Sequence, residues 1–450
     1  MKVAKFGGSS LASAAQVEKV CAIIEQDPGR RVIVVSAPGK RSAEDTKVTD
    51  LLIQLANAAL GGESIDALLQ QIVNRYAEIA QAFGVTDQFV KTIEKDLTGR
   101  LAGKYASEGQ FMDAMKAAGE DNSARLIAEI LQQRGVDAHY VNPKDGGMML
   151  SDEAGNARVL PKSYKRLYTL RARPGVTIFP GFFGYSENGH IVTFPRGGSD
   201  ITGAILAAAV EADIYENFTD VDSVLVANPA FVKNPVPIAS LTYREMRELS
   251  YAGFSVFHDE ALEPVVHAGI PVHVRNTNNP NNSGTAIVKA RQISSEYPVV
   301  GIAATDGFCS IFISKYLMNR QIGFGRRVLQ VLEEAGISYE HTPSGIDNMS
   351  VVIRESNFPK SIERSVLDKL QEAVQADDVT VERGIALVMV VGEGMTRAVG
   401  LTGRAGAALG RGGVNIEMIN QGSSEVSMMF GVKAEEMQTA VQSLYSEFFG

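Results

Sequence analysis

Short apolar runs that end in glycine loops and lead into helical patterns are the feature that most constrains this chain. The run from Met1 to Phe6 ends in the sequence GGSS, and an amphipathic pattern follows from Ala12 to Gln26. A second run, Arg31 to Ser36, is almost continuously apolar, as is typical of strands covered on both faces. Because this alternation continues over about 275 residues, we expect an α/β fold with a mainly parallel sheet.

The remaining elements follow the same alternation. We expect residues 63 to 135 to be mostly helical, and a short strand, 138 to 142, to stop at Pro143. The further expected strands lie in 176–185, 190–194, 214–218 and 271–275, and the further expected helices are 49–60, 201–211, 242–251 and 259–268. The sequence NTNNPNNSGT, 276 to 285, has nothing to bury and marks a turn or a boundary, so we expect the domain to end near 290 to 298.

The last third of the chain contains an internal repeat. The segment beginning at Ala335 matches the segment beginning at Gly412, and Gly336 aligns with Gly413 at an offset of 77 residues. Each copy has the pattern strand, glycine loop, helix, strand, turn, strand, which predicts a duplicated α+β module whose two copies pack together. We therefore predict three domains: residues 1–292, 293–376 and 377–450.

Composition limits the environment and the partners. The formal net charge is −9, and no block of like charges or basic stripe occurs, so we expect no nucleic-acid partner. No 18-residue apolar run and no signal-peptide pattern occur, so we expect no membrane partner. The two cysteines, Cys21 and Cys309, lie far apart, which favours buried thiols in a reducing cytoplasm over a disulfide framework.

Two glycine loops carry charged residues where strands end. Lys5 precedes the first loop, and the sequence PRGGSD, 195 to 200, supplies Arg196 and Asp200 at the second. Such a turn can hold a phosphate or can simply connect a strand to a helix, and Asp200 can simply cap its helix. Neither a P-loop nor a dinucleotide-binding glycine motif occurs.

Acidic residues follow two further elements. Glu120 and Asp121 lie in the sequence AAGEDNSARL, and Thr219, Asp220 and Asp222 lie in NFTDVDS after a strand. Ordinary helix starts and turns explain each group separately. Taken together, cations and carboxylates at the carboxyl ends of one sheet favour phosphoryl transfer to a small acid.

These motifs resemble a known family. The ordered set KFGGSS, VTDLL, GEDNSARL, PRGGSD and FTDVDSV, followed by a repeat ending in NIEMINQGSSEVSMMFGV, is similar to the monofunctional, lysine-sensitive aspartokinases of the amino-acid kinase superfamily. The resemblance covers the whole chain and implies a kinase domain followed by paired ACT modules. It implies ATP-dependent phosphorylation of L-aspartate to 4-phospho-L-aspartate, the first step of lysine, threonine and methionine biosynthesis, with Mg²⁺ and feedback by an amino acid.

The resemblance also assigns roles to residues. Lys5 would stabilise the transferring phosphoryl group and Asp200 would orient Lys5. The substrate-binding positions would be Thr49, Glu120, Arg196 and Ser199, with Glu120 facing the ammonium group and Arg196 a carboxylate of aspartate. The nucleotide-binding positions would be Lys5, Phe6, Gly7, Gly8, Ser9, Thr219 and Asp220. No protein metal ligand is implied. Since an aspartate carboxylate is already ionised at pH 7, the reaction needs no general base.

Three positions depart from the family pattern. Asn228 and Ala230 replace an aspartate and an arginine expected to contact ATP, and Ser255 replaces a lysine. The sequence leaves open which cation compensates; the candidates are Lys233, Arg244 and Arg275.

In the repeat, the resemblance implies an amino-acid effector and a homodimer formed through the ACT modules. The implied effector positions are Met318, Phe324, Ser338, Glu340 and Asp347, although these residues can also simply pack the module. The sequence PSGIDNMS departs from the usual stretch, so lysine, threonine or both remain possible.

Two other functions remain as alternatives. One is a kinase of the same superfamily acting on glutamate, N-acetylglutamate or a nucleotide; the ACT-like repeat and GEDNSARL favour aspartate. The other is an amino-acid sensor that has lost catalysis, suggested by the three departures. Detection of an acyl phosphate separates these alternatives.

Overall fold

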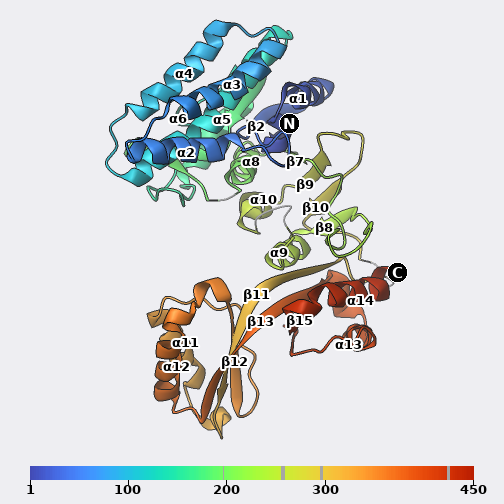
Figure 1. The fold of residues 1–450 in the computed structure, drawn as a ribbon. Coiled ribbons are helices and arrows are strands. Elements are labelled where there is room, and N and C mark those ends of the chain that lie inside the picture. The colour runs from blue at the N-terminus through green and yellow to red at the C-terminus, as the bar shows by residue number, and fades with distance from the viewer. Residues whose placement is uncertain (196, 255–258, 294–296, 423–425) are drawn as a thin grey trace. The chain divides into compact units, whose positions relative to one another are not determined.

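The computed structural model describes residues 1–450 except 196, 255–258, 294–296 and 423–425, and it forms two compact units (Figure 1). Unit 1 contains residues 1–224, 237–246 and 255–291. Unit 2 contains residues 225–236, 247–254 and 292–450. Unit 1 ends at Arg291, but residues 225–236 and 247–254 belong to unit 2 although they lie within the predicted first domain, 1–292, so that domain boundary stays a prediction.

An eight-stranded sheet forms the centre of unit 1, in the order β3-β4-β2-β1-β7-β9-β10-β8. All its neighbouring strands pair in parallel except β9 and β10, which are antiparallel. The strands are β1 (Lys2–Phe6), β2 (Arg30–Val35), β3 (Ala138–Tyr140), β4 (Val176–Pro180), β7 (Ile214–Thr219), β8 (Ser240–Thr242), β9 (Val272–Asn276) and β10 (Thr285–Val288). A separate two-stranded sheet consists of β5 (Phe183–Tyr185) and β6 (Ile191–Thr193).

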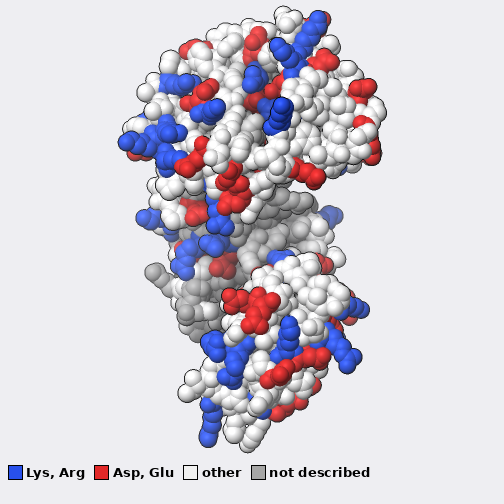
Figure 2. All heavy atoms as spheres, turned by 90° about the vertical axis from the view of Figure 1, so that its left-hand side faces the viewer, with Lys and Arg blue, Asp and Glu red and all other residues white. Residues whose placement is uncertain are grey.

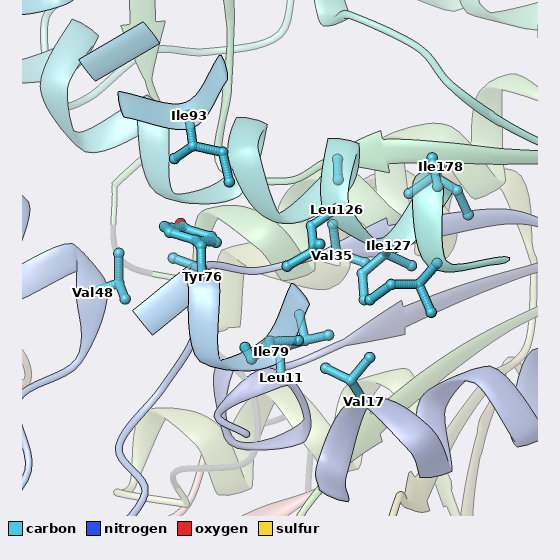
Figure 3. Close-up of a cluster of buried hydrophobic side chains, with 14 of the residues drawn as sticks. Leu11, Val17, Val35, Val48, Tyr76, Ile79, Ile93, Leu126, Ile127 and Ile178 are labelled. Atoms are coloured by element: carbon cyan, nitrogen blue, oxygen red, sulfur yellow. The ribbon is translucent and has the colours of Figure 1, made fainter. Parts of the chain in front are cut away.

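Helices cover both faces of the large sheet. On one face, side chains of β1, β2 and β4 pack with those of α1, α2, α3 and α5 in one hydrophobic core, part of which Figure 3 shows around Tyr76 and Ile127. Helix α8 packs on the other face, against β1, β2 and β7. The helices are α1 (Ala14–Gln26), α2 (Val48–Leu60), α3 (Asp66–Ala82), α4 (Asp87–Leu101), α5 (Glu108–Gln133), α6 (Pro143–Gly146), α7 (Lys162–Leu167), α8 (Gly198–Ala209), α9 (Tyr243–Tyr251) and α10 (Glu263–Ala268).

Capping explains two differences from the predicted boundaries. The strand expected over 138–142 ends at Tyr140, because the Asn142 side chain accepts a hydrogen bond from the N–H of Lys144 and Pro143 begins α6. Helix α8 begins at Gly198, before the predicted start at 201. The preceding Gly197 has φ 78°, a left-handed conformation that favours glycine.

Unit 2 contains a five-stranded sheet in the order β12-β11-β13-β15-β14, in which every neighbouring pair is antiparallel. The strands are β11 (Gly301–Ser314), β12 (Asn348–Arg354), β13 (Asp378–Val391), β14 (Met418–Asn420) and β15 (Ser427–Lys433). The helices are α11 (Phe324–Glu334), α12 (Lys360–Val374), α13 (Leu401–Arg411) and α14 (Met437–Phe449). The predicted fold class, an α/β domain followed by α+β modules, is confirmed.

The predicted repeat is visible in the element bounds. Strands β11 and β13, and helices α11 and α13, each have equal lengths and match at the predicted offset. Two hydrophobic cores result. One contains side chains from Cys309 to Val374, and the other contains Val299 and Ile302 together with residues from Ala386 to Leu444. The cores are therefore interleaved along the chain, since β11 begins in one core and ends in the other. The predicted module limits at 376 and 377 stay a prediction.

Both cysteines are buried, as the sequence predicted. Burial raises the pKa of Cys21 to about 12 and that of Cys309 to about 11, so both side chains are unreactive thiols at neutral pH. On the face of each unit seen in Figure 2, Lys and Arg side chains are interspersed with Asp and Glu side chains. None of the helices in the described part of the chain is both long and apolar enough to span a membrane.

Candidate active site

The central strand of unit 1 places Lys5 in an ion pair. Lys5 and Asn217 are register partners on the parallel strands β1 and β7, so their side chains share the face that α8 covers. The Lys5 Nζ lies 2.8 Å from Oδ1 of Asp200, which lies in the first turn of α8. Asn217 Nδ2 donates to the same oxygen at 2.5 Å. Asp200 and Asn217 therefore fix the ammonium group at the carboxyl end of β1.

The glycine loop lies directly after this ammonium group. A Cβ atom built on Gly7 would lie 3.5 Å from Lys5 Nζ, so the loop backbone and the ammonium are neighbours. Gly8 approaches the turn after β2 so closely that a Cβ on Gly39 would lie 2.6 Å from the Gly8 carbonyl carbon. Gly8 and Gly39 therefore require glycine for packing, apart from any ligand.

Two predicted nucleotide positions already have partners inside the protein. The Phe6 side chain is fully buried and stacks on Phe218, with ring centroids 4.8 Å apart. The Gly7 N–H donates to the Phe218 carbonyl oxygen at 3.2 Å. The Phe6 side chain and the Gly7 N–H are thus engaged, which leaves Gly8 and Ser9 as the remaining backbone of the predicted cradle.

Glu120 is a buried carboxylate without a complete set of partners. It lies in α5, and its Oε2 atom has no hydrogen-bond partner among the described residues. Burial raises the pKa of Glu120 to about 8, although the N–H of Ala37 and the positive charges of Lys47 and Lys5 partly oppose the shift. An unpaired buried carboxylate is costly, so this atom is suited to accept a hydrogen bond from a ligand.

The loop between β2 and α2 connects Thr49 to the same region. Thr49 is half-buried in the first turn of α2, and the N–H of Val48 donates to the Pro38 carbonyl oxygen at 3.0 Å. The buried Arg75 holds this loop by an ion pair with Asp45 at 2.7 Å and a hydrogen bond to the Gly39 carbonyl oxygen at 2.6 Å. Arg75 therefore holds the loop at two points, Asp45 and Gly39.

Helix α8 supplies Ser199 beside Asp200. Ser199 is buried, and a Cβ on Gly181, just after β4, would lie 2.6 Å from its Oγ. This close approach brings the ends of β4 and α8 together. Arg196 and Ser255 lie outside the described residues, so the predicted convergence of Arg196 with Lys5 stays a prediction.

Thr219 is the last residue of β7, and Asp220 follows it. Thr219 Oγ1 donates to Asp220 Oδ1 at 3.2 Å, and Asp220 is exposed. Asp222 accepts hydrogen bonds from Asn276 at 2.7 Å and from Asn279 at 3.3 Å. Sequence motifs predicted Thr219 and Asp220 but not the asparagines that hold the loop behind them.

The structure distinguishes among the three cations proposed to replace the missing phosphate contacts. Arg275 Nη1 forms an ion pair with Glu216 Oε1 at 3.0 Å, and Arg30 Nε pairs with Glu216 Oε2 at 2.6 Å. Arg275 is therefore held in an internal network on the α1 side of the sheet. Lys233 and Arg244 are exposed. In unit 2, Asn228 Oδ1 accepts from the N–H of Ala230 at 2.9 Å, forming a local turn.

The predicted effector residues form two groups in unit 2. Near the start of β12, Asp347 Oδ1 accepts from the N–H of Leu317 at 2.8 Å, which joins Asp347 to the turn containing Met318. The Met318 and Phe324 side chains are buried in the same core. Glu340 lies farther along, because its N–H donates to Val352 near the other end of β12.

The second group has internal partners of its own. Glu340 accepts hydrogen bonds from the Tyr251 hydroxyl and from Arg354 Nε, the latter at 3.1 Å. Ser338 Oγ accepts from Asn357 Nδ2 at 3.2 Å. Val352 lies five residues after Asp347, which along a strand is a span of about 16 Å. The structure thus does not bring all five predicted positions into one cluster.

Asn217, a residue of the candidate site, was not predicted from the sequence, although a buried asparagine next to the buried Glu216 in a strand is a usable signal. No group of three metal-ligating side chains occurs among the described residues. A magnesium ion carried by a nucleotide needs only one or two protein carboxylates, and Asp200 and Asp220 are available donors of that kind.

Comparison with known proteins identifies the family. Residues 1–276 match the amino acid kinase family model, and residues 388–448 match an ACT domain model. The chain is 58% identical over 449 residues to aspartokinase 3 of Bacillus subtilis, covering 100% of this chain and 99% of that protein.

Solved structures agree over the whole chain. The aspartate kinase of Clostridium acetobutylicum superposes with a TM-score of 0.86 at 36% identity, covering 100% of both chains. Escherichia coli aspartokinase III, in complex with aspartate and ADP in its R-state, gives a TM-score of 0.80 at 27% identity, again over 100% of both chains. The same enzyme with lysine and aspartate, in its T-state, gives 0.76 at 26% identity and the same coverage. The chain therefore belongs to the aspartokinases, within the amino acid kinase family.

Proposed function

We propose that this protein transfers the γ-phosphoryl group of ATP to the side-chain carboxylate of L-aspartate, giving ADP and 4-phospho-L-aspartate. This is the first step of lysine, threonine and methionine biosynthesis. Membership of the aspartokinases supports the reaction, as do the aspartate and ADP bound by the similar E. coli enzyme. The single observation that carries the proposal within this chain is the Lys5–Asp200 pair at the carboxyl end of the central strand.

The surroundings of Lys5 support its proposed role as the residue that stabilises the transferring phosphoryl group. Its ammonium is almost fully buried, is held by Asp200 and borders the glycine loop. A fixed cation in such a place needs little reorganisation when negative charge develops on the transferring phosphoryl group. Asp200 acts through Lys5, by holding it in position, and Asn217 supports Asp200.

The reaction requires no proton transfer to begin. A carboxylate oxygen of aspartate forms a bond to the γ-phosphorus, while the bond from that phosphorus to the bridging oxygen breaks and ADP leaves. The carboxyl group has an ordinary pKa near 3.9 and is ionised at neutral pH. The main barrier is the approach of two anions, and the cations of the site lower it.

We assign aspartate to the side of the site formed by Thr49, Glu120, Arg196 and Ser199. The unpartnered Oε2 of Glu120 supports this assignment, because the substrate ammonium would supply the missing hydrogen-bond donor. Binding would also lower the pKa of Glu120 from about 8, since a neighbouring cation favours the ionised form.

We assign ATP to the glycine loop and the end of β7. Lys5, Gly8 and Ser9 would contact phosphates, Phe6 and Gly7 would shape the loop from within, and Thr219 and Asp220 would contact the nucleoside. Mg²⁺ would enter with the phosphates and offset their charge when bound. Asp220, which is exposed and close to the expected nucleotide, is a suitable carboxylate for it.

We propose that an amino-acid end product regulates the enzyme through unit 2. The group at Met318, Phe324 and Asp347 would contact the effector directly, whereas Ser338 and Glu340 would support the neighbouring hairpin. The similar E. coli enzyme is known with lysine in its T-state, which makes lysine the first effector to test. Binding of lysine or threonine would raise the thermal midpoint by linkage.

We also propose a homodimer formed through the ACT modules. Tyr316, Ile322 and Ile346 support it, because these apolar side chains are 71%, 97% and 70% exposed on the first module. Light scattering should give twice the 48.3 kDa mass of one chain, and Ile322→Glu should reduce it to one chain. The reducing cytoplasm remains the expected location, because both cysteines are unpaired.

A hydroxylamine trap tests the reaction directly. Acyl phosphates react with hydroxylamine, so the protein with ATP, Mg²⁺ and aspartate should form a coloured hydroxamate. Parallel reactions with glutamate and N-acetylglutamate should give little product. Product from glutamate alone would reassign the substrate, and no product from any acid would support the sensor alternative instead.

A further inference from the structure

The asparagine-rich turn after β9 contacts two segments of the candidate site. Sequence composition marked residues 276 to 285 as a turn or a domain boundary, and the structure places them inside unit 1, between β9 and β10. The turn lies beside the carboxyl ends of β1 and β7, because Thr277 bonds to Ser10, which follows β1, and to Thr219, the last residue of β7.

Thr277 joins two loops that are far apart in the sequence. Its Oγ1 lies 2.7 Å from the Oγ of Ser10, in the glycine loop, and both side chains are buried. Its N–H donates to the Thr219 carbonyl oxygen at 2.9 Å, at the end of β7. One residue therefore connects the expected phosphate-binding loop to the expected nucleoside-binding loop.

The asparagines around Thr277 fix it in place. Asn276 Nδ2 donates to Asp222 Oδ1 at 2.7 Å, while its own Oδ1 accepts from the N–H of Asn278 at 2.8 Å. Asn278 Oδ1 accepts from Gln16 Nε2 at 3.0 Å and from Lys19 Nζ at 2.7 Å, both in α1. The turn thus contacts α1, the glycine loop and the loop after β7.

We propose that Thr277 is a positioning residue for ATP, which sets the glycine loop at the correct distance from the loop after β7. This inference rests on the proposed assignment of the nucleotide. Consecutive glycines have wide conformational freedom, so the loop that contains Gly7 and Gly8 gains precision from an external contact. Small displacements of a positioned phosphate are costly, since phosphoryl transfer depends mainly on geometry.

Thr277→Val tests the hydroxyl with little change in volume. Loss of one buried hydrogen bond should raise the KM for ATP and the Kd for a non-hydrolysable ATP analogue roughly fivefold. The KM for aspartate should not change, and Thr277→Ser should restore ATP binding. Thr285→Val is the matched control, because the buried Thr285 hydroxyl in the same hairpin bonds to Val224 and Ile238 instead.

A double-mutant cycle that combines Thr277→Val with Ser10→Ala provides the decisive measurement. If Thr277→Val fails to fold, Ser10→Ala alone tests the same contact. The double variant should bind the ATP analogue no more weakly than either single variant, because both substitutions remove one contact. Additive losses, or equal losses in Thr277→Val and Thr285→Val, would overturn the inference. Since nucleotide binding is measured directly, a protein that binds ATP but does not phosphorylate aspartate would contradict the proposed function and leave this test intact.

Discussion

Glu216 and Glu120 of unit 1 are both buried, but they differ in their hydrogen-bond partners and in the direction of their pKa shifts. Glu216 accepts hydrogen bonds from Arg30 and Arg275, whose guanidinium groups also flank the ring of Phe218. Glu120 has one oxygen without any described partner. A carboxylate whose partners all lie within the fold contributes to stability, whereas one with an unmet hydrogen bond is prepared for a ligand.

Their acidities follow from these surroundings. Burial alone would raise the pKa of Glu216, but the hydrogen bonds and charges of Arg30 and Arg275 outweigh it and lower the pKa. For Glu120, burial dominates and raises the pKa to about 8. Strands β1 and β7 carry charged groups on both of their faces. The Lys5–Asp200 pair lies on the face that α8 covers, and the Glu216 network lies on the opposite face. If one face serves catalysis and the other serves stability, substitutions on the two faces should have different effects.

Lys5→Ala should have the largest effect. Removing the cation beside the glycine loop should lower kcat by about 10³-fold, in the range found for loss of one transition-state contact. The fold should persist, because Asn217 still bonds to Asp200. Lys2→Ala is the control from the same strand, since Lys2 pairs with Asp27 at 2.7 Å and should leave kcat unchanged. A Lys5→Ala enzyme with normal turnover would remove Lys5 from the mechanism.

Glu216→Gln should act on stability and not on catalysis. Breaking a buried ion pair costs about 3 kcal/mol, so the thermal midpoint should fall by roughly 6–12 °C while kcat stays near normal. Glu18→Gln should cost less than about 1 kcal/mol, because Glu18 meets Arg134 at an exposed site.

The pH dependence of this variant provides an independent check. Because the pKa of Glu216 is lowered in the folded state, its contribution is present above its ordinary value of 4.5 and is lost as pH falls. Acidification below 4.5 should therefore destabilise the wild type more steeply than Glu216→Gln. Equal acid sensitivity in urea titrations would contradict the role assigned to this network.

Glu120→Gln should act mainly on aspartate binding. Loss of the charge that faces the substrate ammonium should raise the KM for aspartate roughly 10- to 100-fold, with little effect on the KM for ATP. Glu129→Gln, at a half-buried position of the same helix where Glu129 accepts a hydrogen bond from Gln133, should change neither constant.

The raised pKa of Glu120 gives this prediction a pH signature. The ionised form binds the ammonium, so the wild-type KM for aspartate should fall as pH rises to about 8 and then level off. The folded state retains the proton between the ordinary 4.5 and about 8, so the contribution of Glu120 to stability should decrease with rising pH over that interval. A Glu120→Gln enzyme that kept the same pH dependence of KM would assign the titration to another group.

The smallest expected effects concern the effector. Asp347→Asn should reduce the lysine-dependent rise in thermal midpoint, with a loss of lysine affinity of roughly tenfold. Glu340→Gln should alter that affinity less than about threefold, since Tyr251 and Arg354 already occupy the carboxylate. Equal losses in both variants would show that the two groups form one site.

The sequence allowed the fold and part of the site to be predicted. Motifs at strand ends predicted that Lys5 and Asp200 lie together, because parallel strands present their carboxyl ends at one edge of a sheet, and the two side chains are 2.8 Å apart; their roles stay a prediction. The roles of Asn217 and Thr277 were not predicted. The partner of Asn217 depends on strand register, and Thr277 lies in a turn far along the chain from its partner, so no local sequence pattern indicates either contact. Arg275 illustrates the same limit: its charge suggested a phosphate contact, and only its pairing with Glu216 showed that it is used internally.

Strand β11 contributes to both hydrophobic cores of unit 2, which limits where the chain can be divided. A fragment that begins at Asp378 would retain β13 and β15 but lose residues 301–305, which pair with the second half of β13. Its sheet would expose an apolar edge open to unwanted association. The two modules therefore cannot be separated at this point without removing strand residues from one of the two cores.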